Sequence, residues 1–145
     1  MSLTGRVTHI GVCVSDLERA LRFWTALGFE RSVGYPEGHH EGPVLDSLLR
    51  LSGAALDNVF IERDGFRLEL LVFGSPRSAP VARDMSHLGF THISIRVPDI
   101  ERAAEAVAAA GGTVLPDTLI EVGGRKVAIF LRDPDGLPIE LTLGS

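Results

Sequence analysis

Residues 7–21 read VTHIGVCVSDLERAL, and residues 90–104 read FTHISIRVPDIERAA. Aligned without a gap, both stretches contain Thr-His-Ile, then a valine, then Asp-(Leu/Ile)-Glu-Arg-Ala. The histidines of the two copies are His9 and His92. Repetition this dense within 145 residues indicates a duplicated structural module. The repeated histidine is therefore the first candidate for a residue with a chemical role.

The composition is that of a soluble globular protein. With 145 residues, of which 45% are hydrophobic and 23% charged, the chain is expected to fold as a single domain over 1–145. No apolar run approaches the roughly 20 residues of a membrane-spanning helix, so no membrane contact is expected. The net charge of −5 comes without a basic run, which argues against nucleic acid as a partner. Cys13 is the only cysteine, which excludes an internal disulfide and fits a reducing cytoplasm.

Both copies continue into the same series of elements, so an α+β fold of two βαβββ modules is expected. The predicted modules cover about 5–74 and 89–144, with a linker over 75–88. In the first module, β-branched runs and turn signals predict strands at 6–14, 29–33, 57–62 and 66–73, with a helix between Ser15 and Gly28. In the second, they predict strands at 90–97, 113–115, 125–132 and 138–143, with a helix from Asp99 to Gly111.

One stretch, 34–58, has no counterpart in the second module. Its first part, GYPEGHHEGP, has the Gly and Pro content of a loop, and residues 44–53 predict a short helix. In the predicted strand 6–14, side chains alternate between the two faces, so His9 lies on the face opposite to Ile10 and Val12. The apolar stripe of the first helix is expected to pack on that Ile10/Val12 face, which leaves His9 on the concave side of a curved mixed sheet.

A glutamate stands at the matching place in the last strand of each module, within Leu68-Glu69-Leu70 and Ile139-Glu140-Leu141. Glu69 follows His9 by 60 residues and Glu140 follows His92 by 48, and the stretch 34–58 accounts for the difference. Two modules related by an approximate twofold axis would bring the four side chains together.

Two imidazoles and two carboxylates suit one divalent transition metal, such as Zn, Ni, Co, Mn or Fe, better than Ca or Mg. Four ligands on a six-coordinate ion leave two positions open for water or for a bidentate oxygen substrate.

The segments HIGVCVSDLERALRFW, RLELL, THISIRVPDIERA and DPDGLPIEL resemble the vicinal oxygen chelate superfamily, which includes glyoxalases, bleomycin resistance proteins and extradiol dioxygenases. The resemblance covers about residues 5–144. It implies paired βαβββ modules around a funnel-shaped metal site, and frequently a homodimer. The implied metal ligands are His9, Glu69, His92 and Glu140.

The resemblance implies a metal-dependent isomerase or lyase that moves a proton next to a metal-bound carbonyl of a small oxygenated substrate or thioester. The ligand set and its spacing are most similar to those of glyoxalase I and methylmalonyl-CoA epimerase, and the implied catalytic base is Glu140 or Glu69. Two alternatives stay open: an extradiol-type ring-cleaving dioxygenase, and a non-catalytic protein that binds a small molecule or drug.

Further residues are candidates for contact with a substrate. Ser94 and Arg96 share the strand face of His92, and His39 and His40 lie in the loop of the unmatched stretch. Phe60, Phe73 and Phe130 are candidates for an apolar wall, although core packing is their default role.

Overall fold

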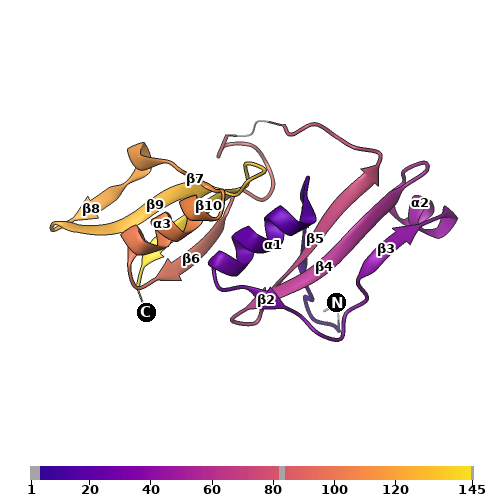
Figure 1. The fold of residues 1–145 in the computed structure, drawn as a ribbon, viewed down its shortest axis with the longest axis horizontal. Coiled ribbons are helices and arrows are strands. Elements are labelled where there is room, and N and C mark those ends of the chain that lie inside the picture. The colour runs from indigo at the N-terminus through magenta and orange to yellow at the C-terminus, as the bar shows by residue number, and fades with distance from the viewer. Residues whose placement is uncertain (1–3, 82–83, 145) are drawn as a thin grey trace. The chain divides into compact units, whose positions relative to one another are not determined.

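The structure is a computed structural model that describes residues 4–81 and 84–144. The described residues form two compact units. The first contains residues 4–17 and 28–78, and the second contains residues 18–27, 79–81 and 84–144. Each unit has its own five-stranded sheet (Figure 1).

The first unit consists of one mixed sheet and one short helix. Its strands are β1 (Ile10–Cys13), β2 (Glu30–Arg31), β3 (Gly38–Glu41), β4 (Ala55–Arg63) and β5 (Phe66–Ser75), and its helix is α2 (Pro43–Leu49). The strand order is β1-β5-β4-β2, and β3 pairs with β4. The first strand, β1, runs parallel to the last strand, β5, while the other pairs are antiparallel.

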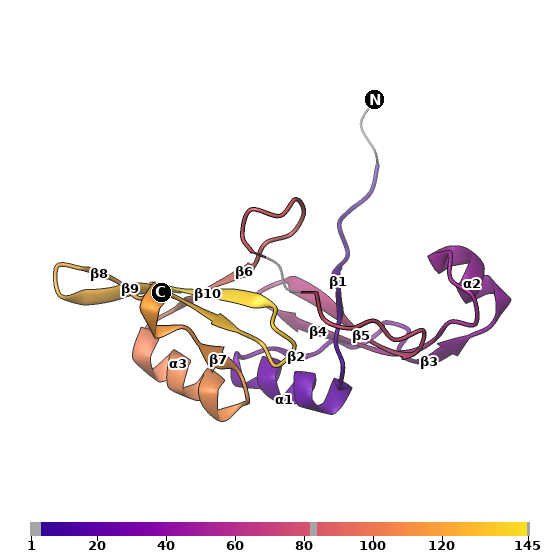
Figure 2. The same ribbon diagram turned by 90° about the horizontal axis from the view of Figure 1, so that it is seen from above.

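The second unit repeats this arrangement. Its elements are β6 (Ile93–Val97), α3 (Ile100–Ala109), β7 (Thr113–Val114), the 3-10 turn η1 (Pro116–Thr118), β8 (Ile120–Val122), β9 (Arg125–Arg132) and β10 (Pro138–Leu143). The strand order is β6-β10-β9-β7, with β8 paired to β9. Again the first strand, β6, is parallel to the last, β10. Helix α3 packs on β7, β9 and β10 and covers one face of this sheet (Figure 2).

The duplication predicted from the repeat is confirmed by strand register. Gly11, two residues after His9, is the partner of Glu69 across the β1–β5 pair. Ser94, two residues after His92, is the partner of Glu140 across the β6–β10 pair. The α+β class and the two βαβββ modules are therefore correct, and the strands form one mixed sheet in each module.

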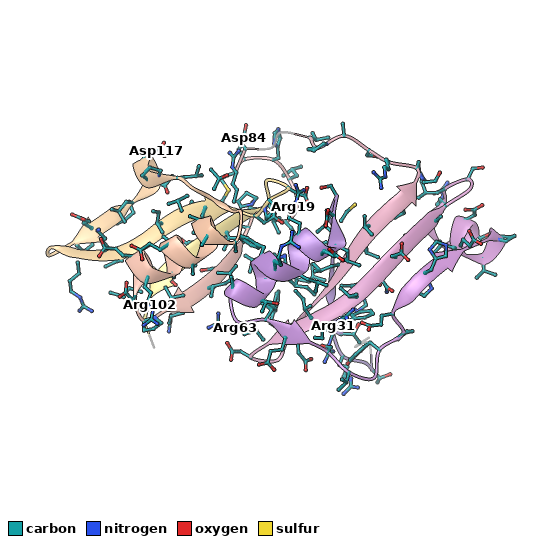
Figure 3. All side chains as sticks on the ribbon, viewed as in Figure 1. Arg19, Arg31, Arg63, Asp84, Arg102 and Asp117 are labelled. Atoms are coloured by element: carbon teal, nitrogen blue, oxygen red, sulfur yellow. The ribbon has the colours of Figure 1, made fainter. Side chains whose placement is uncertain are left out.

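Helix α1 (Leu17–Ala26) corrects one packing prediction. Its residues from Glu18 onward belong to the second unit rather than to the sheet of its own module. The fully buried ring of Phe23 lies against Gly112, which follows α3. Arg19, labelled in Figure 3, forms an ion pair with Asp135 at 2.9 Å. The apolar stripe was read correctly, but a stripe does not specify which of two similar units will bury it.

Two short strands were missed. The segment 38–41, predicted as loop, is strand β3, which pairs antiparallel with β4 over Gly38↔Asn58 to Glu41↔Ala55. Residues 120–122 form β8, the equivalent strand of the second unit. Conversely, β1 is shorter than predicted, because it lies at the edge of its sheet and the carbonyl of Thr8 accepts a hydrogen bond from Arg67 Nη1 at 3.1 Å instead.

No helix within residues 4–81 and 84–144 combines the length and the apolar character that crossing a bilayer requires.

Gly112→Ala tests the packing of α1 in the second unit. A Cβ at this position would lie 2.6 Å from Phe23 Cε2 and 2.9 Å from the Arg132 carbonyl oxygen. We expect the free energy of unfolding to fall by about 1–3 kcal/mol, as for other overpacked sites. Gly5→Ala is the control, because its Cβ would meet nothing within 4 Å. Equal stabilities of the two variants in urea denaturation would contradict this packing.

Candidate metal centre

The first unit brings His9 and Glu69 together. His9 directly precedes β1, and Glu69 lies in the neighbouring parallel strand β5. The atoms His9 Nε2 and Glu69 Oε2 are 3.1 Å apart, and their side chains are 33% and 19% exposed. Leu68 and Leu70, on the other face of β5, are fully buried. The pair thus occupies the face of the sheet that remains accessible within this unit.

The second unit repeats the pair with His92 and Glu140. Here Nε2 and Oε2 are 3.6 Å apart, and the side chains are 28% and 27% exposed. Ile139 and Leu141, on either side of the glutamate, are fully buried on the opposite face. Because side chains alternate along β10, Glu140 lies on the accessible face of its sheet, as Glu69 does in the first unit.

The threonine of each Thr-His dipeptide orients the imidazole that follows it. Thr8 Oγ1 is 3.0 Å from His9 Nδ1, and Thr91 Oγ1 is 2.9 Å from His92 Nδ1. A hydroxyl both donates and accepts, so it satisfies Nδ1 whether or not that nitrogen carries the proton. With Nδ1 occupied, Nε2 is the nitrogen that faces the carboxylate. This is the arrangement by which proteins orient a metal-binding histidine.

A phenylalanine ring flanks each histidine. The ring centroids of His9 and Phe60 are 5.2 Å apart at 83°, and those of His92 and Phe130 are 5.2 Å apart at 75°. Phe60 is the cross-strand partner of Glu69, as Phe130 is of Glu140. Two of the three predicted apolar-wall residues thus lie beside the His–Glu pairs. Their rings limit imidazole rotation and exclude water from one side of each pair.

The two units differ in what surrounds the carboxylate. In the first unit, Asn58 Nδ2 donates a hydrogen bond to Glu69 Oε1 at 2.6 Å. The position that corresponds to Asn58 in the second unit is Ala128, which pairs with Thr142 two residues beyond Glu140. Among the residues that the structure describes, Glu140 has His92 as its ion-pair partner and receives no amide hydrogen bond.

Arg67 is a second difference between the units. Its guanidinium pairs with Glu62 at 2.6 Å and lies 3.9 Å from the centroid of the Tyr35 ring, which in turn lies 5.1 Å from Phe60. The equivalent residue in the second unit, two positions before its glutamate, is Pro138. Arg67 thus holds Tyr35, which belongs to the unmatched stretch, beside Phe60 and so close to the His9–Glu69 pair.

The four residues predicted to contact substrate have different surroundings. Ser94 and Arg96 are exposed on β6, on the face of Glu140. The Arg96 stem lies over Gly144, where a Cβ would come within 2.5 Å of Arg96 Cδ. Within the described part of the chain, Arg96 forms no ion pair.

His39 and His40, predicted in a loop, lie on strand β3 and have different partners. His39 Nδ1 is 3.1 Å from Asp57 Oδ1, and its hydrogen bonds to Asp57 and Glu41 raise the pKa of the exposed imidazole. His40 Nε2 is 3.0 Å from Asn58 Oδ1, which connects it to the Glu69 side of the first pair. Contact of either histidine with substrate stays a prediction.

The donor set fits a divalent transition metal. Each unit offers an imidazole nitrogen and a carboxylate oxygen on one accessible face, with the imidazole already oriented by a threonine. No group of three or more His, Cys, Asp or Glu side chains suited to a metal is found within 4–81 and 84–144. Convergence of both pairs on one ion stays a prediction.

The sequence predicted the two His–Glu pairs, but not the asparagine and threonine side chains that orient them. Asn58 gave a usable signal, because an amide within an apolar strand is costly to bury unless it is hydrogen-bonded. The threonines stood in the repeat itself, but their bond to the following ring depends on a side-chain rotamer that the sequence does not reveal.

Comparison with known proteins identifies the family. The family model described as the Glyoxalase/Bleomycin resistance protein/Dioxygenase superfamily matches residues 6–141. The chain belongs to this superfamily. Similar solved structures share its fold: a glyoxalase family protein from Bacillus cereus superimposes with a TM-score of 0.79 at 17% identity, covering 98% of this chain and 95% of that one. A mutant of the fosfomycin resistance protein FosX from Listeria monocytogenes was solved in complex with Mn(II) and 1S,2S-dihydroxypropylphosphonic acid. It superimposes with a TM-score of 0.59 at 18% identity, covering 99% of this chain and 95% of that one.

Proteins with similar sequences are named as lyases. An Arabidopsis thaliana protein named "Probable lactoylglutathione lyase, chloroplastic" is 42% identical over 143 residues, which cover 94% of this chain and 35% of that protein. A Vibrio parahaemolyticus protein named "Probable lactoylglutathione lyase" is 28% identical over 147 residues, covering 94% of this chain and 89% of that protein. The chain spans less than half the length of the plant relatives it matches.

Thr91→Val tests whether the threonine orients the ring. The variant keeps the shape but removes the hydroxyl from His92 Nδ1, so the ring can rotate and its Nε2 no longer has one direction. We expect metal affinity, measured by isothermal titration of the metal-free protein with Co²⁺, to fall about 10-fold or more. Thr91→Ser retains the hydroxyl, so its Co²⁺ affinity should stay within about threefold of that of the unmodified protein, well below the loss typical of such orienting residues. Equal losses in both variants would contradict the orienting role.

Proposed function

We propose that this protein is a metal-dependent lyase or isomerase of the glyoxalase type. It moves a proton on the carbon next to a carbonyl group of a small oxygenated substrate or thioester. The observation that carries the proposal is the duplicated Thr–His–Glu arrangement, in which each Nε2 faces a carboxylate oxygen at 3.1 or 3.6 Å. The names of the plant and Vibrio relatives support a glyoxalase-type reaction.

His9, Glu69, His92 and Glu140 are the proposed ligands of one divalent ion, which is Zn, Ni, Co, Mn or Fe. When bound, such an ion acts as a Lewis acid that polarises a carbonyl oxygen and makes the neighbouring C–H more acidic. The Mn(II) complex of the FosX mutant supports a divalent metal in this fold. We further propose that the protein acts in the cytoplasm as a homodimer.

Glu140 is the proposed base, and Glu69 the fixed ligand. A base must be free to turn from its resting contact toward the substrate carbon and back. Glu69 is restrained by the amide of Asn58 at 2.6 Å, whereas Ala128 stands at that position beside Glu140. Glu140 is also the more exposed of the two, at 27% against 19%. The difference in restraint supports our proposal that the second unit carries out proton transfer.

Arg96 and Ser94 are proposed to bind the polar end of the substrate. They follow His92 at two-residue steps along β6, so their side chains extend from the His–Glu pair along one face of the strand. A guanidinium without an ion pair selects for carboxylate or phosphate. The substrate is therefore proposed to carry an anionic group some distance from the reacting carbonyl.

Glu140→Gln tests the assignment of the base on an identified substrate. A panel of glutathione hemithioacetals, acyl thioesters and catechols, with oxygen consumption recorded, would supply that substrate. Because Gln can bind metal through its carbonyl oxygen but cannot accept the proton, we expect kcat to fall about 10²–10⁴-fold while metal stays bound. The matched variant Glu69→Gln should reduce kcat less. Full turnover by Glu140→Gln would contradict the assignment, and oxygen-consuming catechol cleavage would favour a dioxygenase.

Arg96→Ala tests the anion-binding role. Loss of a charge-assisted contact of about 1.5–3 kcal/mol should raise KM about 10- to 100-fold for an anionic substrate. Arg96→Lys, which keeps the charge, should retain part of the affinity. KM for an uncharged analogue should change little in either variant. An equal rise in KM for charged and uncharged substrates would contradict the proposal.

A further inference from the structure

Asn58 stands out because it is a polar side chain in the buried part of β4. It is only 4% exposed, and the neighbouring residues of the strand, Val59, Phe60 and Ile61, are buried as well. A buried amide is costly unless its donors and acceptor are all satisfied. The contacts that satisfy it reach in two directions, to Glu69 on β5 and to the segment 36–41.

Both ends of the amide are occupied. Oδ1 accepts a hydrogen bond from the Gly38 amide at 3.0 Å and contacts His40 Nε2 at 3.0 Å. Nδ2 donates to Glu69 Oε1 at 2.6 Å and to the Pro36 carbonyl oxygen at 3.3 Å. The reverse orientation would place Oδ1 against a carboxylate and a carbonyl. The partners therefore fix which way the amide points.

Because of this contact, the two oxygens of the Glu69 carboxylate have different partners. Oε1 receives the Asn58 hydrogen bond, and Oε2 faces His9 Nε2 at 3.1 Å. A carboxylate held by one oxygen presents the other in one direction. The second unit has Ala128 in place of Asn58, so this restraint belongs to the unit that also carries the unmatched stretch.

We propose that Asn58 is a positioning residue that holds Glu69 as a one-oxygen ligand and couples its orientation to the segment 36–41. In this role Asn58 acts through Glu69, to which it donates a hydrogen bond, and not as a ligand itself. The inference rests on the proposed function in taking Glu69 as a metal ligand. By thermodynamic reciprocity, contacts that order 36–41 strengthen metal binding, and metal binding orders 36–41.

The first arm of the test measures metal affinity. Titration of metal-free protein with Co²⁺ should show affinity about 10- to 100-fold weaker for Asn58→Ala than for the unmodified protein, as for other residues that orient a ligand. Asp57→Ala is the matched control, because Asp57 is the neighbour of Asn58 on β4 but is exposed and pairs with His39 rather than with Glu69. Its affinity should change by less than about threefold, well below that loss. A folded Asn58→Ala protein with a lowered Tm but unchanged Co²⁺ affinity would overturn the proposal.

The second arm needs no metal. The exchange rate of the Gly38 amide proton, whose acceptor is Asn58 Oδ1, is measured by NMR in metal-free protein. Glu69→Ala should accelerate this exchange severalfold, but should add nothing in the Asn58→Ala background, because the two residues act in series. Additive effects would overturn the coupling. If the unmodified protein binds no Co²⁺ but the exchange effects are non-additive, the proposed function and the metal-ligand part of the inference fail, while the coupling of Glu69 to the segment 36–41 through Asn58 stands.

Discussion

The parallel pairing of the first and last strands of each unit is the constraint on which the candidate centre depends. In a βαβββ unit the chain leaves the first strand through a helix and returns after two more strands. Only parallel pairing of β5 with β1, and of β10 with β6, places the glutamate two positions from the histidine in register. A shift of one residue would turn the glutamate to the buried face, because side chains alternate along a strand. The buried apolar residues on either side of each glutamate, Leu68 and Leu70 in one unit and Ile139 and Leu141 in the other, prevent that shift.

The two copies have kept the pair and diverged around it. Thr-His, the glutamate and the phenylalanine opposite it recur with closely similar distances in both units. The first unit carries Asn58 and Arg67, where the second has Ala128 and Pro138, and it also contains helix α2. The second has kept an open face along β6 that ends in Arg96. This division suits a centre in which one carboxylate is held and the other moves.

The sequence pattern was sufficient to predict the class, the modules, the last strand 138–143 to the residue, and the pairing of each histidine with a glutamate of its own module. These features follow from local alternation and from duplication, which a single sequence contains. The packing of α1 in the second unit was not predictable, because its apolar stripe fits either of two similar units. Strand β3 was not predictable either, because its pairing with β4 depends on Asn58, 20 residues away from Gly38. The role of Asn58 needed the positions of all its partners.

The central claim is that two imidazoles and two carboxylates, one pair from each copy, bind a single divalent ion. X-ray absorption spectroscopy of the protein loaded with Co²⁺ tests this claim most directly. The account predicts one equivalent of metal per chain, with about two imidazoles in the scattering pattern, oxygen atoms as the remaining ligands, and loss of one imidazole in His9→Ala or in His92→Ala. A centre that retains both imidazoles when His9 or His92 is replaced, or a protein that binds no stoichiometric metal, would contradict it.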